Sequence, residues 1–395
     1  MKPLPVGARP ASRIAPQSGV RRNALSPTFL TALRLLMLAL VALPLLTGIA
    51  GGLLRVGITL PAFVDCTWPG RAALAHAALM ISGFLGTVIG IERAVAVKQP
   101  AALAAPLASS LGGLCLLLGQ SMAGAWMGVV AAAIFVGVNA VVVQRQRAAH
   151  TVLLLVGAGA WAAGNLLLAL GGGSVEVLPW WFAFLVMTIA AERLEMTRLM
   201  RRRPAAQGLL CAVLAALLLG AALSSLSAVA GGVLYGAALA LLALWLAVFD
   251  IARRTVFAHG LSRYMAICLL GGYAWLAVAG AAWAATALGM PVRDTALHAL
   301  GLGFILSMVM GHAPVILPAV ARVKLQFGAF FYVPLAALHA SLVLRLGFGT
   351  LAPSLRTLGA ALNAAALALF AATVLGAALA WRLRHGAASL PRKIS

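Results

Sequence analysis

Long runs of apolar residues, each closed by a short polar or charged segment, recur along the whole chain of 395 residues. Each run holds about 18–25 residues, enough for an α-helix to cross the ~30 Å hydrocarbon core of a bilayer. We number the expected membrane-spanning helices as spans 1 to 12. They cover residues 29–53, 71–97, 101–120, 122–143, 150–171, 179–198, 207–226, 229–251, 265–288, 295–319, 327–347 and 357–382. The pattern therefore predicts an all-α integral membrane protein.

Composition supports this class and divides the chain into three parts. Hydrophobic residues make up 63% of the chain and charged residues only 9%, against about 25% charged in soluble domains. We expect a basic, disordered tail at 1–28, a single membrane domain at 29–385 and a second tail at 386–395. Only the polar pair Gln120-Ser121 separates spans 3 and 4.

The basic residues predict the orientation of the helices. With the N-terminus inside, all but five of the 29 Lys and Arg residues fall in inner segments, and the exceptions are Arg55, Arg71, Arg293, Arg345 and Arg356. By the positive-inside rule, both termini are expected in the cytoplasm, and the membrane is expected to be a bacterial inner (plasma) membrane. The net charge of +22 thus reflects topology. Charges scattered over short inner loops do not form the single basic surface of a nucleic-acid-binding protein.

Three of the twelve spans share a short internal repeat. Residues 83–93 read GFLGTVIGIER, residues 183–193 read AFLVMTIAAER and residues 303–313 read GFILSMVMGHA. Phe84, Phe184 and Phe304 align, and eight residues later come Glu92, Glu192 and His312. The three segments lie on spans 2, 6 and 10, which are four helices apart and all run from outside to inside. This spacing points to a threefold repeat of four helices.

In this topology and these motifs, the chain resembles the haem-copper oxidase catalytic-subunit superfamily, and within it most nearly NnrS-type haem membrane proteins or their uncharacterised relatives. The resemblance implies three arcs of four helices around a pseudo-threefold axis. It also implies a low-spin haem b held between histidines of spans 2 and 10 near the outer face.

His76 and His298 occupy the positions that this resemblance singles out. At helical rise, His76 lies about 7 Å and His298 about 5 Å inside the outer boundary of its span, so their depths match. Two neutral imidazoles on facing helices can bind the two axial positions of one haem iron. Met80, one turn after His76, is expected to pack against the haem. Alternatively, each histidine is an interfacial anchor.

The resemblance fails at the copper centre of the oxidases. That centre takes one histidine from span 6 and two adjacent histidines from the start of span 7, whereas neither span contains a histidine here. We therefore expect no oxidase-type copper centre, no terminal oxidase activity and no proton pumping coupled to oxygen reduction. Whether the protein is an enzyme is left open.

A second group of polar residues is expected at the inner ends of the repeated helices. Around the axis, Glu92, Glu192 and His312 would form a polar collar that binds a proton, a small molecule or a metal ion. The alternative is a set of interfacial ion pairs between each glutamate and the arginine that follows it. His339 on span 11 lies near mid-membrane and is a weaker candidate for the haem pocket. A second, inner haem between His339 and His312 is not expected, because they lie at about 18 Å and 10 Å from the inner boundary.

The leading functional hypothesis is therefore a haem-binding membrane protein that transfers electrons or handles nitric oxide, with a redox partner or a small diatomic ligand. The first alternative is a secondary transporter that uses the Glu/Glu/His collar as a proton site. Against it, such transporters are usually built from inverted twofold repeats with broken helices. The second alternative is a cofactor-free assembly factor for a respiratory complex.

Overall fold

The computed structural model describes residues 27–59, 61, 65–196, 204–320 and 322–386, and within them every regular element is a helix. These residues hold twelve helices long and apolar enough to cross a membrane, which confirms the expected all-α polytopic membrane fold. Each helix begins and ends within a few residues of its expected span. The two tails lie outside the described residues, except for Pro27, Thr28 and Gly386, which are helical.

Most spans are single α-helices, and four are composite. Spans 1, 4 to 9 and 12 are α1 (Pro27–Arg55), α6 (Ser121–Arg145), α7 (Ala149–Ala169), α8 (Ser174–Met196), α9 (Pro204–Leu223), α10 (Ala228–Phe249), α12 (Gly260–Ala287) and α16 (Pro353–Gly386). Span 2 joins α2 (Trp68–Leu74), α3 (His76–Ala78), η2 (Leu79–Gly86) and α4 (Thr87–Val97), and span 3 joins η3 (Pro100–Leu103) and α5 (Ala104–Leu117). Span 10 joins α13 (Arg293–His298), η5 (Ala299–Leu306) and α14 (Ser307–Val320), and span 11 joins η6 (Ala329–Phe331), α15 (Tyr332–Leu342), η7 (Val343–Gly347) and η8 (Phe348–Thr350). The short helix α11 (Ala252–Thr255) lies between spans 8 and 9.

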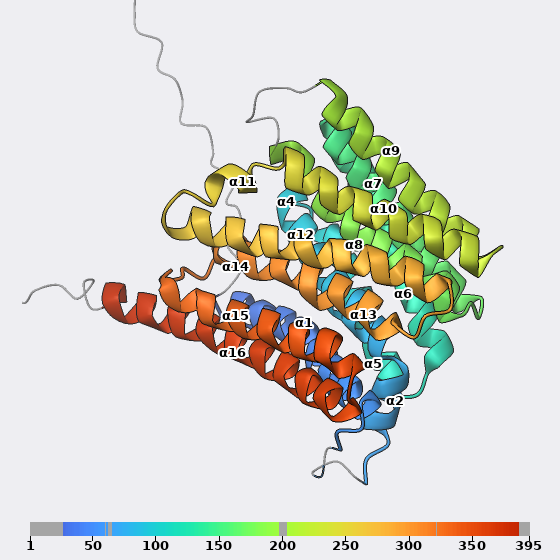
Figure 1. Cartoon of the computed structure of the whole chain (residues 1–395). Helices are drawn as coiled ribbons and strands as arrows, with labels where there is room; N and C mark the ends of the chain where they lie inside the picture. The colour runs from blue at the N-terminus through green and yellow to red at the C-terminus, as the bar shows by residue number, and fades with distance from the viewer. Residues whose placement is uncertain (1–26, 60, 62–64, 197–203, 321, 387–395) are drawn as a thin grey trace, which may run out of the picture.

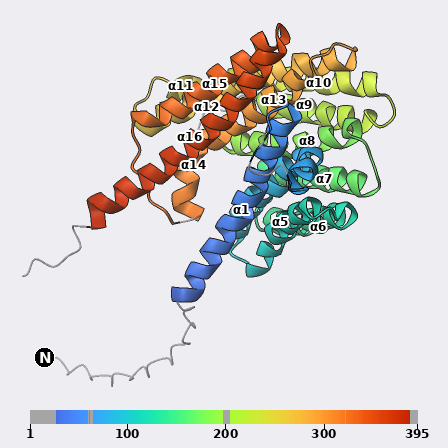
Figure 2. The ribbon, with the colours of Figure 1, turned by 90° about the horizontal axis from the view of Figure 1, so that it is seen from below.

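Spans that follow one another in the chain pack side by side in one bundle (Figure 1). The connection between spans 3 and 4 contains Gly119 at φ +84°, a left-handed conformation that glycine adopts without strain. The first and last spans converge at one end of the bundle (Figure 2), where the Thr357 hydroxyl donates to the carbonyl of Val56 at 3.1 Å. This hydrogen bond connects the end of the first span to the start of the last span.

The three repeated helices meet in the middle of this bundle. Span 2 contacts both span 6 and span 10, and the Arg193 guanidinium of span 6 is hydrogen-bonded to His312 of span 10. Spans 6, 10 and 2 are also the most buried, with 72%, 61% and 56% of an 18-residue stretch inside the bundle, against 17% and 11% for spans 1 and 12. An arrangement of three arcs around one axis predicts three central helices, one from each set of four, and spans 2, 6 and 10 have these positions.

Two of the repeated helices share a feature that the sequence pattern did not reveal. A π-helical segment spans Leu79–Gly86 in span 2 and Ala299–Leu306 in span 10. Phe84 and Phe304 are each the sixth residue of their segment, so the two segments coincide in the repeat. Such wider turns are rare and frequent at functional sites. Here each one directly follows the short helix that carries His76 or His298.

Candidate functional site

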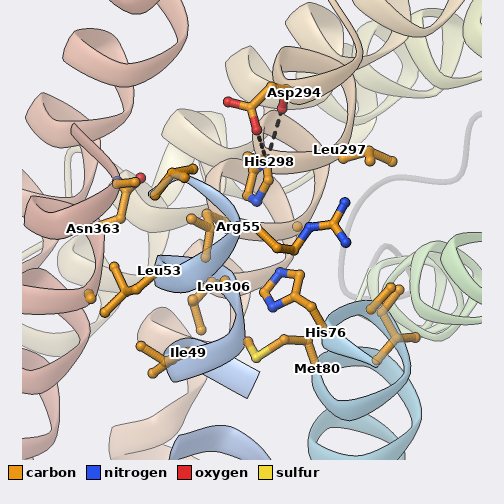
Figure 3. A pocket seen from close by; sticks show the side chains of 18 of the residues that line it. Ile49, Leu53, Arg55, His76, Met80, Asp294, Leu297, His298, Leu306 and Asn363 are labelled. Carbon is orange, nitrogen blue, oxygen red and sulfur yellow. Dashed lines mark hydrogen bonds and ion pairs between the residues drawn. The ribbon is translucent and has the colours of Figure 1, made fainter. Parts of the chain in front are cut away.

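A cavity of about 620 Å³ opens at the end of the bundle that carries His76 and His298 (Figure 3). Its walls come from spans 1, 2, 6, 10, 11 and 12. Most of the lining is apolar, and the polar exceptions are two histidines, four arginines, one aspartate, one serine and one asparagine. This size and composition are typical of a site for a cofactor or another amphiphilic small molecule.

His76 is held by the first helix. Its Nδ1 lies 2.8 Å from the carbonyl oxygen of Gly48, and since a carbonyl only accepts, Nδ1 carries the proton. The ring lies against Gly52, where an added Cβ would be 2.7 Å from the ring carbon Cε1. The glycines of α1 therefore let the two helices approach closely enough to fix the imidazole, and neutral His76 keeps an unshared pair on Nε2.

His298 is held in the same tautomer by its own helix. Its Nδ1 lies 3.0 Å from the carbonyl oxygen of Asp294 and 2.9 Å from the Asp294 carboxylate. Both groups are acceptors, so Nδ1 donates and Nε2 of the neutral ring is left with its unshared pair. Metal-bound histidines share this arrangement, in which the second nitrogen donates to a carbonyl or carboxylate.

The structure brings the two imidazoles together, although they come from segments more than 200 residues apart in the chain. Their ring centroids are 6.4 Å apart, with 27° between the ring planes, and both rings face the cavity (Figure 3). Two imidazoles on opposite sides of one metal ion, each with a metal–nitrogen bond of about 2.1 Å, have ring centres about 6 Å apart. The observed centroid separation matches this distance.

The donor set fits a metal macrocycle better than a bare ion. Among the described residues, no group of three or more His, Cys, Asp or Glu side chains could hold a metal ion. Two imidazoles alone do not complete the tetrahedral shell that zinc prefers. A haem supplies four equatorial nitrogens of its own and needs only two axial ligands from the protein.

Arg345 is the buried cation of the cavity. Its Nε and Nη2 atoms donate to the two carboxylate oxygens of Asp294 at 3.0 Å and 2.9 Å, which is a bidentate ion pair. Nη2 also lies 3.3 Å from Nδ1 and 3.1 Å from Nε2 of His298. A nitrogen almost equidistant from both ring nitrogens lies over the face of the imidazole, not along the unshared pair of Nε2.

Three further arginines stand at the mouth of the cavity, and all are exposed: Arg55, Arg293 and Arg356. Arg55 donates to the carbonyl of Ala73 at 3.2 Å, and Arg293 donates to the hydroxyl of Ser174 at 2.8 Å. Guanidinium groups bind carboxylates with two parallel hydrogen bonds. An apolar floor below a cationic mouth matches an amphiphile with acidic groups on one edge, such as the two propionates of haem.

Sequence reasoning found the two histidines but missed the polar groups around them. Met80, which is expected to pack against the haem, lines the cavity. The sequence identifies Arg345, Arg293 and Arg356 as cations of the outer side. The contact between Asp294 and His298 could have been predicted from the sequence, because residues four apart share a helix face. The contact of Arg345 with them depends on span 11 lying beside span 10, which no local pattern specifies.

At the opposite end of the repeated helices, the structure changes the expected polar collar. His312 Nε2 accepts from Nη2 of Arg193 at 2.9 Å, and its Nδ1 donates to the carbonyl of Met308 at 2.7 Å. His312 is therefore bonded to an arginine and not to the glutamates. Arg193 is buried, and its Nε has no hydrogen-bond partner within the described part of the chain.

The two glutamates of the collar lie within electrostatic range of each other and of Arg93 and Arg193. In the described ranges, no ion pair within 4.0 Å joins Glu92 or Glu192 to an arginine; Glu195 lies 3.7 Å from His150. The simple alternative, a glutamate paired with the arginine next to it, is therefore not seen in these ranges. The cluster mixes acidic and basic groups at the meeting point of three spans.

His339 lies outside the residues that line the cavity. Its Nδ1 accepts from Nε1 of Trp275 at 2.7 Å, and the planes of the two rings are 11° apart, with the ring centroids 6.4 Å from each other. The structure thus places it between spans 9 and 11 and does not bring it to the other two histidines. The hydrogen bond to the half-buried indole of Trp275 accounts for the isolated histidine in the sequence.

Comparison with known proteins gives a family and no function. Residues 34–379 match the family described as Domain of unknown function (DUF8744), and the chain belongs to this family. No curated protein and no solved structure matches the chain.

Proposed function

We propose that this protein binds one haem b in the cavity, with His76 and His298 as axial ligands, and that it transfers electrons within the membrane. The observation that carries the proposal is the pair of imidazoles whose ring centroids are 6.4 Å apart, each with Nδ1 held by an acceptor and an unshared pair on Nε2. Bound there, haem would supply one-electron redox chemistry at a potential tuned by its ligands.

The other residues of the cavity would exclude water, bind the haem carboxylates and position His298. The apolar side chains of spans 1, 2, 6 and 10 exclude water from the macrocycle, and the arginines at the mouth bind its carboxylates. Asp294 accepts a hydrogen bond from Nδ1 of His298, and Arg345 holds the Asp294 carboxylate in place. With both His76 and His298 holding the haem, no coordination position would be left for a diatomic ligand, so the arrangement favours electron transfer. Handling of nitric oxide, which the resemblance implies, would require one imidazole to dissociate.

The proposal is tested by the visible reduced-minus-oxidised spectrum of the purified protein and of three variants. We expect a sharp low-spin b-type band in the wild type, and its loss in His76→Ala and in His298→Ala. His339→Ala is the matched control, because this histidine also lies in a span but outside the cavity. Variants that keep their fold and the full band would overturn the assignment of the ligands.

A second function, proton-coupled transport, is favoured by one observation. The cluster around Glu92 and Glu192 holds charged groups where three spans meet, and intramembrane charges commonly mark ion pathways. Reconstituted vesicles with a pH-sensitive dye inside would reveal a proton flux that Glu192→Gln removes. Haem-free protein that shows this flux would favour transport, and haem-free protein without flux would favour the assembly factor.

A further inference from the structure

Asp294 and Arg345 form an ion pair that contacts His298, and neither residue is one of the two proposed haem ligands. The Asp294 carboxylate accepts from His298 Nδ1 at 2.9 Å, and Arg345 clamps the same carboxylate with two hydrogen bonds. On the other side of the cavity, the hydrogen-bond partner of His76 within the described residues is the backbone carbonyl of Gly48. The two imidazoles therefore have unequal partners, one anionic and one neutral.

We infer that Asp294 and Arg345 act as opposed positioning residues, which set the donor strength of the His298 imidazole and with it the reduction potential of the site. This inference rests on the proposed function. A carboxylate that accepts from Nδ1–H makes Nε2 the stronger donor, and second-layer partners of this kind tune metal sites. A stronger donor stabilises the oxidised metal, so Asp294 lowers the potential.

Arg345 works in the opposite direction for two reasons. Its charge partly neutralises the carboxylate, which weakens the effect of Asp294 on the imidazole. The same charge, with the Arg345 side chain only 8% exposed, favours the reduced state of a nearby metal because it is poorly screened by water. The two residues thus have opposite effects on the reduction potential. Loss of either one would move the potential away from the wild-type value.

The side chains around the pair fit this role. Asn363 accepts from Arg345 Nη1 at 3.5 Å and donates to the hydroxyl of Ser341 at 2.7 Å. Arg345, Asn363 and Ser341 are all buried. The arginine extends from span 11 and is hydrogen-bonded both to Asn363 of span 12 and to Asp294 of span 10.

A spectroelectrochemical titration of the purified holoprotein tests the inference. We expect the midpoint potential to rise in Asp294→Asn, which keeps the shape but loses the charge, and to fall in Arg345→Gln. Arg345→Lys keeps the charge without the two-pronged hydrogen bond, and it should shift the potential less than Arg345→Gln. Arg254→Gln is the control, because Arg254 is an exposed arginine that does not belong to the cavity lining.

The outcomes separate this inference from the proposed function. Opposite shifts in Asp294→Asn and Arg345→Gln, each larger than that of Arg254→Gln, support opposed effects of the two residues, whereas a merely structural role would move both variants alike. Haem-loaded variants with the potential of the wild type would overturn the inference and leave the haem site standing. A folded wild-type protein without haem would overturn both.

Discussion

At the scale of single residues, the account depends on hydrogen bonds that fix the proton of each imidazole on Nδ1 and so leave the unshared pair on Nε2. His76 and His298 differ in their partners, yet both donate from Nδ1. The family resemblance singled out these two histidines, and their matching depths within the spans supported the prediction that they would pair. Their tautomers could not be predicted, because they depend on a carbonyl of another helix and on an aspartate one turn away.

The close approach of Gly52 to His76 gives a first prediction. In Gly52→Ala, the new Cβ would lie 2.7 Å from Cε1 of His76, so the imidazole must move. We expect the haem content of the purified variant to fall several-fold while its melting temperature changes little, since a side-chain end can shift cheaply. Gly159→Ala is the control, because nothing lies within 4 Å of its added Cβ. Full haem content in Gly52→Ala would contradict this role of the glycine.

The hydrogen bond between His312 and Arg193 gives a second prediction. His312→Ala leaves the buried guanidinium without this acceptor, which costs about 1–3 kcal/mol of stability. His312→Gln restores an acceptor and should recover part of the loss. Thermal unfolding in detergent measures both variants, and equal melting temperatures for the two would show that the bond contributes nothing.

At the scale of elements, the sequence predicted the twelve spans and the convergence of three of them, because hydrophobic length and a repeated Phe-x7-Glu/His spacing are local signals. It did not predict that η2 and η5 would be π-helical. Their segments, LMISGFLG and ALGLGFIL, contain the same kinds of residues as ordinary apolar helices. The wider turns depend on packing between spans, which is not written in one segment.

Two glycines of η5 allow a matched test of this packing. An added Cβ at Gly303 would lie 2.5 Å from Cβ of Trp275, near the rigid backbone of α12. An added Cβ at Gly301 would only meet Phe182 at 3.8 Å, an ordinary contact. We therefore expect Gly303→Ala to lose about 1–3 kcal/mol of stability and Gly301→Ala to remain near the wild type, as measured by thermal unfolding. The reverse order would refute this packing.

At the scale of the whole molecule, the helices explain why the candidate site lies at one end of the bundle. Every span that lines the cavity contributes residues from the end that carries Arg55, Arg293 and Arg356. The predicted orientation puts this end outside. The sequence reached that orientation from the basic residues alone, whereas the cavity itself required the relative placement of six spans.

Thiol labelling tests the orientation. Cys66 is exposed and lies just before span 2, on the predicted outer side. We expect a membrane-impermeant maleimide to label the wild type in intact cells, and Cys66→Ser to lose this labelling. In that background, a cysteine in place of Phe257, which is 84% exposed on the predicted inner side, should react only after permeabilisation. Labelling of the Phe257→Cys site in intact cells would contradict the orientation.

The central claim is that the cavity holds one haem between His76 and His298, and the most direct measurement is the molar ratio of haem to chain in the protein as purified. The account predicts a ratio near one, with the low-spin spectrum of bis-histidine ligation and no change on adding carbon monoxide to the reduced protein. A well-folded protein whose ratio is near zero, even after incubation with free haem, would contradict it.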